Sequence, residues 1–366
     1  MGKEIITQKQ SIAIMISFIL GSTLVLGTGA EARQDVWLSI LLAMLITVPI
    51  YLVYSRLLSD FPGTSLYGIL INVFGNIFGR VMALPFIWFA FHIGALVMRN
   101  FTEFIEIVSL QETPQFIIAV CMAVLCIWAV REGIEVIGRW TSIMLPIIML
   151  AILVVTFLFV NILDFENLKP VLYNGFKPVA ESAFSVFAFP FAEVVVFTTI
   201  LDRLRPGSSL YKVYLKSLVI GGAIILLVSV RSLLSLGVAN ISILHFSSYA
   251  SVRLINIGNF LQRIEVSVTM VFFFAGFVKI CACLYAASTG IAKVLNIQNY
   301  RNIVAPIGLL MMIFSIIMYK STAEMFDWAV EIYKYYAFPF EVALPLFILT
   351  AAEIKLFLKK RKTSMP

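Results

Sequence analysis

The sequence predicts an all-α integral membrane protein with about ten transmembrane helices. Hydrophobic residues make up 61% of the 366 residues, charged residues make up 13%, and the mean hydropathy is +1.00. A soluble domain carries about 25% charged and ~45–50% apolar residues, so a water-soluble fold of this size could not bury so much apolar surface. Apolar runs of about 20 residues, the length that crosses a bilayer core as a helix, recur along the chain. We therefore expect lipid to surround this protein.

Ten apolar runs have the length of membrane-spanning helices. The first run is about twenty residues long, which exceeds the ~7–15 residues of a signal-peptide core, so we expect it to remain as a span. We expect no soluble domain between the runs. The expected spans are residues 11–31, 36–56, 82–108, 115–131, 140–160, 182–201, 217–238, 266–290, 303–319 and 335–356, and the long connections are residues 57–81, 161–181 and 239–265.

The ten spans divide into two sets of five. We expect a single transmembrane domain over residues 1–366, with halves at about residues 1–160 and 161–356 and a basic cytoplasmic tail at residues 357–366. Lysine and arginine gather in alternate connections and in the tail, which is the pattern of cytoplasmic loops. An even number of spans with both termini in the cytoplasm fits this asymmetry. It also explains the net charge of +7 without a nucleic-acid partner.

The first span of each half contains residues that interrupt a helix. The first span carries Gly21-Ser22-Thr23, and the sixth carries Phe189-Pro190-Phe191. Proline removes a backbone donor and clashes with the preceding turn. In lipid, such a break is tolerated where the freed backbone groups face protein or a water-filled cavity. Paired interrupted helices indicate a transporter-like binding site at the membrane midplane, although close helix packing and a simple kink would leave the same residues.

Ionisable residues within the apolar runs are the second functional signal. A charge in the membrane is costly and marks a functional site or an internal pair. Glu193 follows the break in span six, Lys279 lies in span eight, Arg231 lies in span seven, and Glu341 lies in span ten. Lys279 either meets a ligand carboxylate, replaces a coupling cation, or pairs with Glu193 or Glu341. The sequence does not choose between these alternatives.

The sequence shows no motif that is typical of catalysis or cofactor binding. The chain has two histidines and four cysteines, and they show no metal-ligand spacing. The cysteines lie inside apolar runs, where small buried side chains are expected. The sequence contains neither a dinucleotide-binding fingerprint nor a phosphate-binding loop. We therefore expect no catalytic residues, no metal, no cofactor and no enzymatic activity.

Several short motifs occur in one order along most of the chain. They are Gln34-Asp35-Val36-Trp37, Phe61-Pro62-Gly63-Thr64-Ser65-Leu66, the stretch from Gly75 to Gly79, Thr113-Pro114, Arg131-Glu132-Gly133-Ile134-Glu135-Val136 with Arg139, Phe189-Pro190-Phe191-Ala192-Glu193, and Arg263-Ile264-Glu265. In this order they resemble the spore germination permease family of the amino acid–polyamine–organocation superfamily. Arg33 departs from the family pattern, which has a small residue before Gln34-Asp35.

The resemblance implies a fold and a role. The implied fold is a five-plus-five inverted repeat like that of bacterial leucine-type transporters, with helices 1 and 6 broken. The implied role is that of the B subunit of a germinant receptor in the spore inner membrane, acting with an A subunit and a C lipoprotein. Such a subunit binds a small germinant, most often an amino acid. The implied pocket residues are Gly21, Ser22, Thr23, Ile93, Phe189, Pro190, Phe191 and Lys279.

A proton- or sodium-coupled amino-acid permease is the alternative function. The same fold would support it, because fold does not fix function. In that case the carboxyl groups of Glu193 and Glu341 would be the candidate proton carriers.

Overall fold

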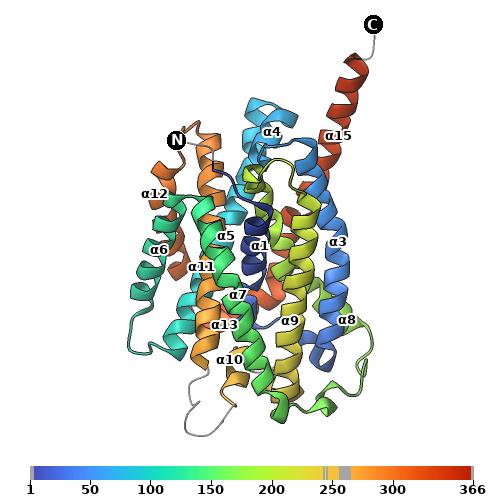
Figure 1. Ribbon diagram of the computed structural model, residues 1–366, viewed down its shortest axis with the longest axis vertical. Helices are drawn as coiled ribbons and strands as arrows, with labels where there is room; N and C mark the ends of the chain where they lie inside the picture. The colour runs from blue at the N-terminus through green and yellow to red at the C-terminus, as the bar shows by residue number, and fades with distance from the viewer. Residues whose placement is uncertain (1–3, 242–243, 245, 255–264, 364–366) are drawn as a thin grey trace.

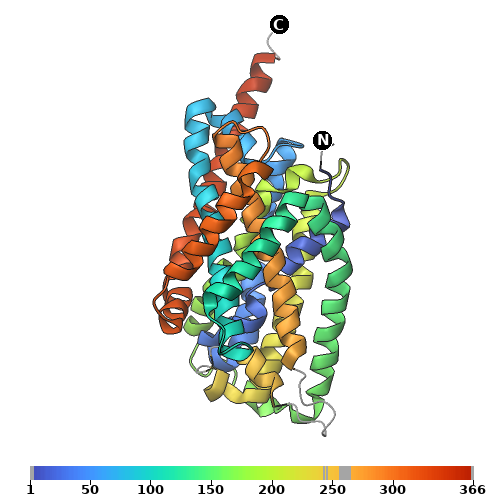
Figure 2. The ribbon, with the colours of Figure 1, turned by 90° about the vertical axis from the view of Figure 1, so that its left-hand side faces the viewer.

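The computed structural model describes residues 4–241, 244, 246–254 and 265–363, and these residues form a bundle of helices (Figures 1 and 2). Of the family-like motifs, Arg263 and Ile264 lie outside the described residues. The described helices, including short 3₁₀ and π segments (η), are α1 Gln8–Leu20, α2 Thr23–Leu26, η1 Ala30–Asp35, α3 Val36–Asp60, α4 Leu66–Phe74, α5 Asn76–Val108, α6 Gln115–Glu132, α7 Ile134–Leu158, η2 Val160–Ile162, η3 Phe165–Leu168, α8 Lys177–Val186, η4 Phe187–Phe191, η5 Ala192–Thr199, η6 Leu201–Arg203, α9 Leu210–Ile241, α10 Ser247–Val252, α11 Glu265–Val294, α12 Arg301–Ile317, α13 Thr322–Asp327, η7 Trp328–Ile332, α14 Tyr333–Phe338, η8 Pro339–Ala343 and α15 Leu344–Thr363.

Seven helices of the described chain are long and apolar enough to cross a membrane. They correspond to predicted spans two to eight. The first predicted span is the shorter α1 followed by α2. The last two are α12 and the segment Thr322–Lys359, which pass the same test together and meet at a bend of 107°. The chain is thus a multi-pass membrane protein.

The predicted connection over residues 57–81 is more ordered than the sequence indicated. It contains α4, and α5 already begins at Asn76. Gly75 has a φ of 86°, which glycine adopts without strain, and it separates the two helices. Gly79 permits their close approach, because a Cβ there would lie 2.5 Å from the Leu70 carbonyl oxygen. The prediction missed α4 because its apolar run is shorter than a membrane span.

Both predicted breaks are present. Helix α1 ends at Leu20 and α2 begins at Thr23, whose hydroxyl donates to the Ile19 and Leu20 carbonyls. Phe189 is extended within η4, with φ −125° and ψ 113°. The hydroxyl of Tyr51 on α3 donates to the carbonyl of Phe191 at 2.9 Å. Backbone groups at both breaks therefore bond to protein groups, as a break inside a membrane requires.

The start of α1 and the end of α15 lie at the same end of the bundle (Figures 1 and 2). Helix α10 and the start of α8 lie at the opposite end (Figure 1). One cluster of buried apolar side chains runs through the bundle from α1 to α15. Large apolar side chains also point outward, such as Leu45 on α3 and Phe157 on α7. Such outward apolar faces suit a lipid environment.

Candidate functional site

The centre of the candidate site is a buried ion pair between two predicted residues. Lys279 on α11 forms an ion pair with one carboxylate oxygen of Glu193 on η5. The hydroxyl of Tyr333 on α14 donates to the other carboxylate oxygen. Lys279 is 0% exposed and Glu193 is 2% exposed. The sequence left several partners open for Lys279, and in the structure its partner is Glu193. Both oxygens of the Glu193 carboxylate accept a hydrogen bond, one from Lys279 and the other from Tyr333.

Two aromatic rings cover the ammonium group of Lys279. Its Nζ lies 4.9 Å from the centre of the Phe18 ring on α1 and 5.0 Å from the centre of the Phe189 ring at the break in span six. Cations are attracted to the faces of aromatic rings. The ammonium is therefore held by one carboxylate and two rings. These groups bring together spans one, six and eight.

Gly21 lies against the aliphatic part of Lys279. A Cβ at this position would lie 2.5 Å from Lys279 Cδ and 3.2 Å from Lys279 Cβ. The space beside Gly21 is therefore occupied by the stem of Lys279, which is another of the predicted pocket residues.

Replacing Gly21 with alanine is therefore expected to destabilise the protein. The added methyl group would force Lys279 or α1 to move, at a cost of about 1–3 kcal/mol. Gly276→Ala on α11 is the matched control, because a Cβ there would meet its nearest neighbour, Phe101 Cδ2, at 4.0 Å. Thermal unfolding of the purified variants measures both effects. Equal Tm values for the two variants would contradict the packing of Gly21 against Lys279.

A partly open cavity of about 520 Å³ reaches Phe189, whose ring covers the ammonium of Lys279. Polar side chains from several elements face it. Of the predicted pocket residues, Thr23 and Phe189 line this cavity, and the other six are not part of its lining. The residues that line it are Thr23, Leu26, Gly27, Thr28, Gly29, Glu31, Arg33, Ser185, Val186, Phe189, Val228, Ser229, Ser232, Ile241, Leu244, Ser247, Ser248, Phe326, Asp327, Ala329, Val330 and Glu331.

Phe189 touches both the cavity and the ion pair. It lines the cavity, and its ring also covers Lys279 Nζ. The ring packs edge-on against Tyr333, the residue that donates to Glu193. A molecule in the cavity would thus contact the aromatic residue that shields the buried charges.

The sequence missed the α9, α10 and η7 walls of this cavity. One signal was present in α9, where Ser229 and Ser232 are three residues apart in an apolar run and so share a helix face. Tyr333 was also missed. It lies two residues before the last predicted span, and the sequence alone does not reveal which carboxylate its hydroxyl meets.

The remaining predicted residues are buried. Ile93 on α5 is 0% exposed and packs in the core. Glu341 in η8 is also 0% exposed, and neither of its carboxylate oxygens has a hydrogen-bond partner among the described residues. Its backbone carbonyl accepts from the Tyr54 hydroxyl at 2.5 Å. Arg231 on α9 is buried and donates to the Ser248 hydroxyl at 3.2 Å. Within the described ranges, no group of three or more His, Cys, Asp or Glu side chains is placed to hold a metal ion.

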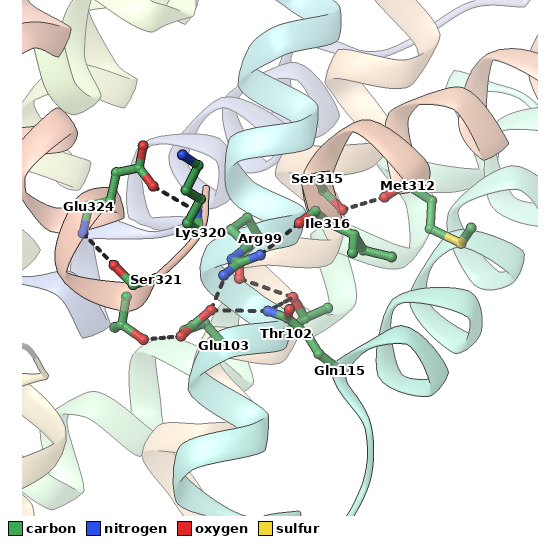
Figure 3. A network of polar contacts seen from close by, with 11 residues as sticks. Arg99, Thr102, Glu103, Gln115, Met312, Ser315, Ile316, Lys320, Ser321 and Glu324 are labelled. Carbon is green, nitrogen blue, oxygen red and sulfur yellow. Dashed lines mark hydrogen bonds and ion pairs between the residues drawn. The ribbon is translucent and has the colours of Figure 1, made fainter. Parts of the chain in front are cut away.

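A second polar network holds the bend between α12 and α13 (Figure 3). The spacing of Arg99 and Glu103 predicts an ion pair on one face of α5, and the structure confirms it at 2.9 Å. Arg99 also donates to the Ile316 carbonyl at 3.0 Å, and Gln115 donates to Glu103 at 3.1 Å. The hydroxyl of Thr322 at the start of α13 donates to Glu103 as well. This network fixes the base of the segment that contributes Phe326, Asp327, Ala329, Val330 and Glu331 to the cavity lining.

The fold is that of a known class of transporter. The crystal structure of MhsT in complex with L-phenylalanine aligns with 96% of this chain and 89% of that chain, with a TM-score of 0.68. MhsT has the leucine-transporter fold. The sequence identity of 12% means that this likeness shows the fold alone. The predicted fold class, including broken helices 1 and 6, is confirmed.

Sequence comparisons identify the family. The family model described as Spore germination protein matches residues 5–323. Spore germination protein KB of Bacillus subtilis (strain 168) is 29% identical over 99% of this chain and 97% of its own length. Spore germination protein YndE of the same organism is 22% identical over 79% of this chain and 81% of its own length. The chain therefore belongs to the spore germination protein family.

Proposed function

We propose that this chain is the B subunit of a spore germinant receptor that binds a small germinant, an amino acid, and signals to partner subunits. The observation that carries this proposal is the Lys279–Glu193 pair, which is buried where broken spans one and six meet and is linked to a partly open cavity by Phe189. Family membership supports a role in germination. The partners would be an A subunit and a C lipoprotein, and the location would be the spore inner membrane with both termini in the cytoplasm.

The proposed mechanism starts with the ligand in the cavity. An amino acid carries a carboxylate and an ammonium, which complement the charges of Lys279 and Glu193. Displacement of the Phe189 ring would let these groups meet the ion pair. The ligand would then compete with Tyr333 for Glu193, which loosens the contact between spans six and ten.

Ligand binding shifts a conformational equilibrium only through its different affinities for the two states. Here the two states would differ in whether Glu193 is bound by Lys279 and Tyr333 or by the ligand. The moving part would be the span-ten segment with Tyr333. Its other end is anchored by the Arg99–Glu103 network. This mechanism involves no chemical step, and we propose that the protein is not an enzyme.

A germination assay tests the proposed role. Spores that lack this chain are expected to lose the response to one class of amino acid and to regain it when the gene is restored. Their response to a germinant that bypasses receptors should be unchanged, which is the control. The A and C subunits should also co-purify with the tagged chain. Unaltered responses to every amino acid in a full panel would contradict the proposal.

A proton-coupled amino-acid permease is the second candidate. The observation that favours it is Glu341, a fully buried carboxyl group without a hydrogen-bond partner among the described residues. Such a group in a membrane protein is a candidate proton carrier. A permease would accumulate the amino acid in proteoliposomes under a proton gradient, whereas a sensor would bind it without accumulation.

A further inference from the structure

Arg231 is a buried cation outside the site described above. It lies in the middle of α9 and is 4% exposed. Among the side chains that the structure describes, no carboxylate forms an ion pair with it. Its Nη2 donates to Ser248 at 3.2 Å, its Cζ lies 4.7 Å from the centre of the Phe159 ring, and its Nε has no hydrogen-bond acceptor in the described part of the chain.

A small cavity of about 20 Å³ adjoins this guanidinium. Its polar lining consists of Arg231, Ser248 on α10 and Ser267 on α11, and the rest is apolar. A space of this size holds one occupant about as large as a water molecule, since roughly 10–15 Å³ of such volume is the minimum for one water. Val228 and Ser248 line both this cavity and the 520 Å³ cavity, so the two are neighbours.

We propose that the small cavity binds a monovalent inorganic anion of the size of chloride, held by the Arg231 guanidinium and the hydroxyl groups of Ser248 and Ser267. Buried charges in proteins are paired, because an isolated charge in an apolar medium is costly. A guanidinium has only donors, and hydroxyl groups can donate as well. The polar lining therefore offers hydrogen-bond donors and a positive charge to one small occupant.

The size and the charge of the site decide the type of occupant. The space of about 20 Å³ matches a single-atom occupant better than a carboxylate or a phosphate group, each of which has several heavy atoms. A water molecule fits, but it brings no negative charge to Arg231, which has no carboxylate partner among the described side chains. A monoatomic anion satisfies both conditions.

Binding of the anion would link two of the helices that line the larger cavity. Arg231 belongs to α9, Ser248 to α10 and Ser267 to α11, and the first two elements line the larger cavity. The anion would therefore stabilise the folded protein and fix α9 against α10. This inference does not depend on the proposed germinant, because the same site would be present in a permease.

Thermal unfolding in defined salts tests the site. The full-length protein, purified in detergent with gluconate as the anion, is titrated with chloride at constant ionic strength. We expect a saturable rise in Tm of about 5 °C at a chloride concentration on the order of 100 times the Kd. The variant Arg231→Gln should lose this rise. Ser235→Ala, on α9 but outside both cavities, should keep it.

Two further measurements keep the test decisive if Arg231→Gln does not fold. Ser248→Ala retains the guanidinium and removes one donor, so it should raise the chloride concentration at half-effect about tenfold. Bromide bound to crystals of the wild-type protein should give an anomalous peak beside Arg231. A Tm that is equal in chloride and gluconate, an unchanged response of Ser248→Ala, or a water molecule in place of bromide would overturn the proposal.

Discussion

Removal of one partner of the Lys279–Glu193 pair is expected to lower the free energy of unfolding by about 3–5 kcal/mol. Lys279→Met leaves the Glu193 carboxylate buried without its ion-pair partner, and Glu193→Gln leaves the Lys279 ammonium buried without the carboxylate that it contacts. Thermal unfolding of the purified variants, with denaturant titration where it is reversible, measures the loss. Glu135→Gln is the control. It breaks the exposed Arg139–Glu135 pair, and such a change costs only about 0–1 kcal/mol.

The double variant Lys279→Met/Glu193→Met separates stability from function. Replacing both members of a buried ion pair with apolar side chains is often neutral or stabilising. We therefore expect the double variant to recover most of the lost stability. It should still fail to respond to the germinant, because both charges that would meet the ligand are absent. Two outcomes would contradict the role given to this pair. The double variant could lose as much stability as the two single variants together, or it could still respond to the germinant.

Filling the larger cavity is expected to abolish ligand binding. Ser229 on α9 lines the cavity and is half-buried. An indole at this position can therefore project into the open space of the cavity. A bound amino acid at 100 times its Kd stabilises a protein by about 2.7 kcal/mol. Ser229→Trp should lose this stabilisation completely and keep a Tm close to that of the wild type without ligand.

Ser229→Ala is the matched control for this variant. It removes the hydroxyl and leaves the cavity open, so it should retain most of the ligand-induced stabilisation. The germination response should follow the same order, with equal amounts of protein in the spore membrane. A full ligand response in Ser229→Trp would place the binding site elsewhere in the bundle.

The membrane fold follows from the sequence because its main signals are local. Apolar length predicts spans, and the Gly21 and Pro190 breaks follow from the backbone preferences of glycine and proline. Helix α4, Leu66–Phe74, was missed because the prediction recognised helices by the length of their apolar runs, and this run is too short to span a membrane.

The contacts of the site are not local, and the sequence could not supply them. Glu193 and Glu341 each follow a Phe-Pro-Phe motif, so sequence gave equal reason to pair either one with Lys279. The choice depends on the relative positions of spans six, eight and ten, which are set by packing. For the same reason the sequence identified neither Tyr333 nor the contact between Gly21 and the Lys279 stem.

The central claim is that this chain binds an amino acid and signals without transporting it. The most direct test combines thermal stabilisation of the purified protein by a panel of amino acids with uptake of any stabilising compound into proteoliposomes. Stabilisation of the wild type that is absent in Ser229→Trp, with no uptake under a proton or sodium gradient, is the predicted result. Gradient-driven accumulation of the amino acid would contradict the claim and identify the chain as a permease.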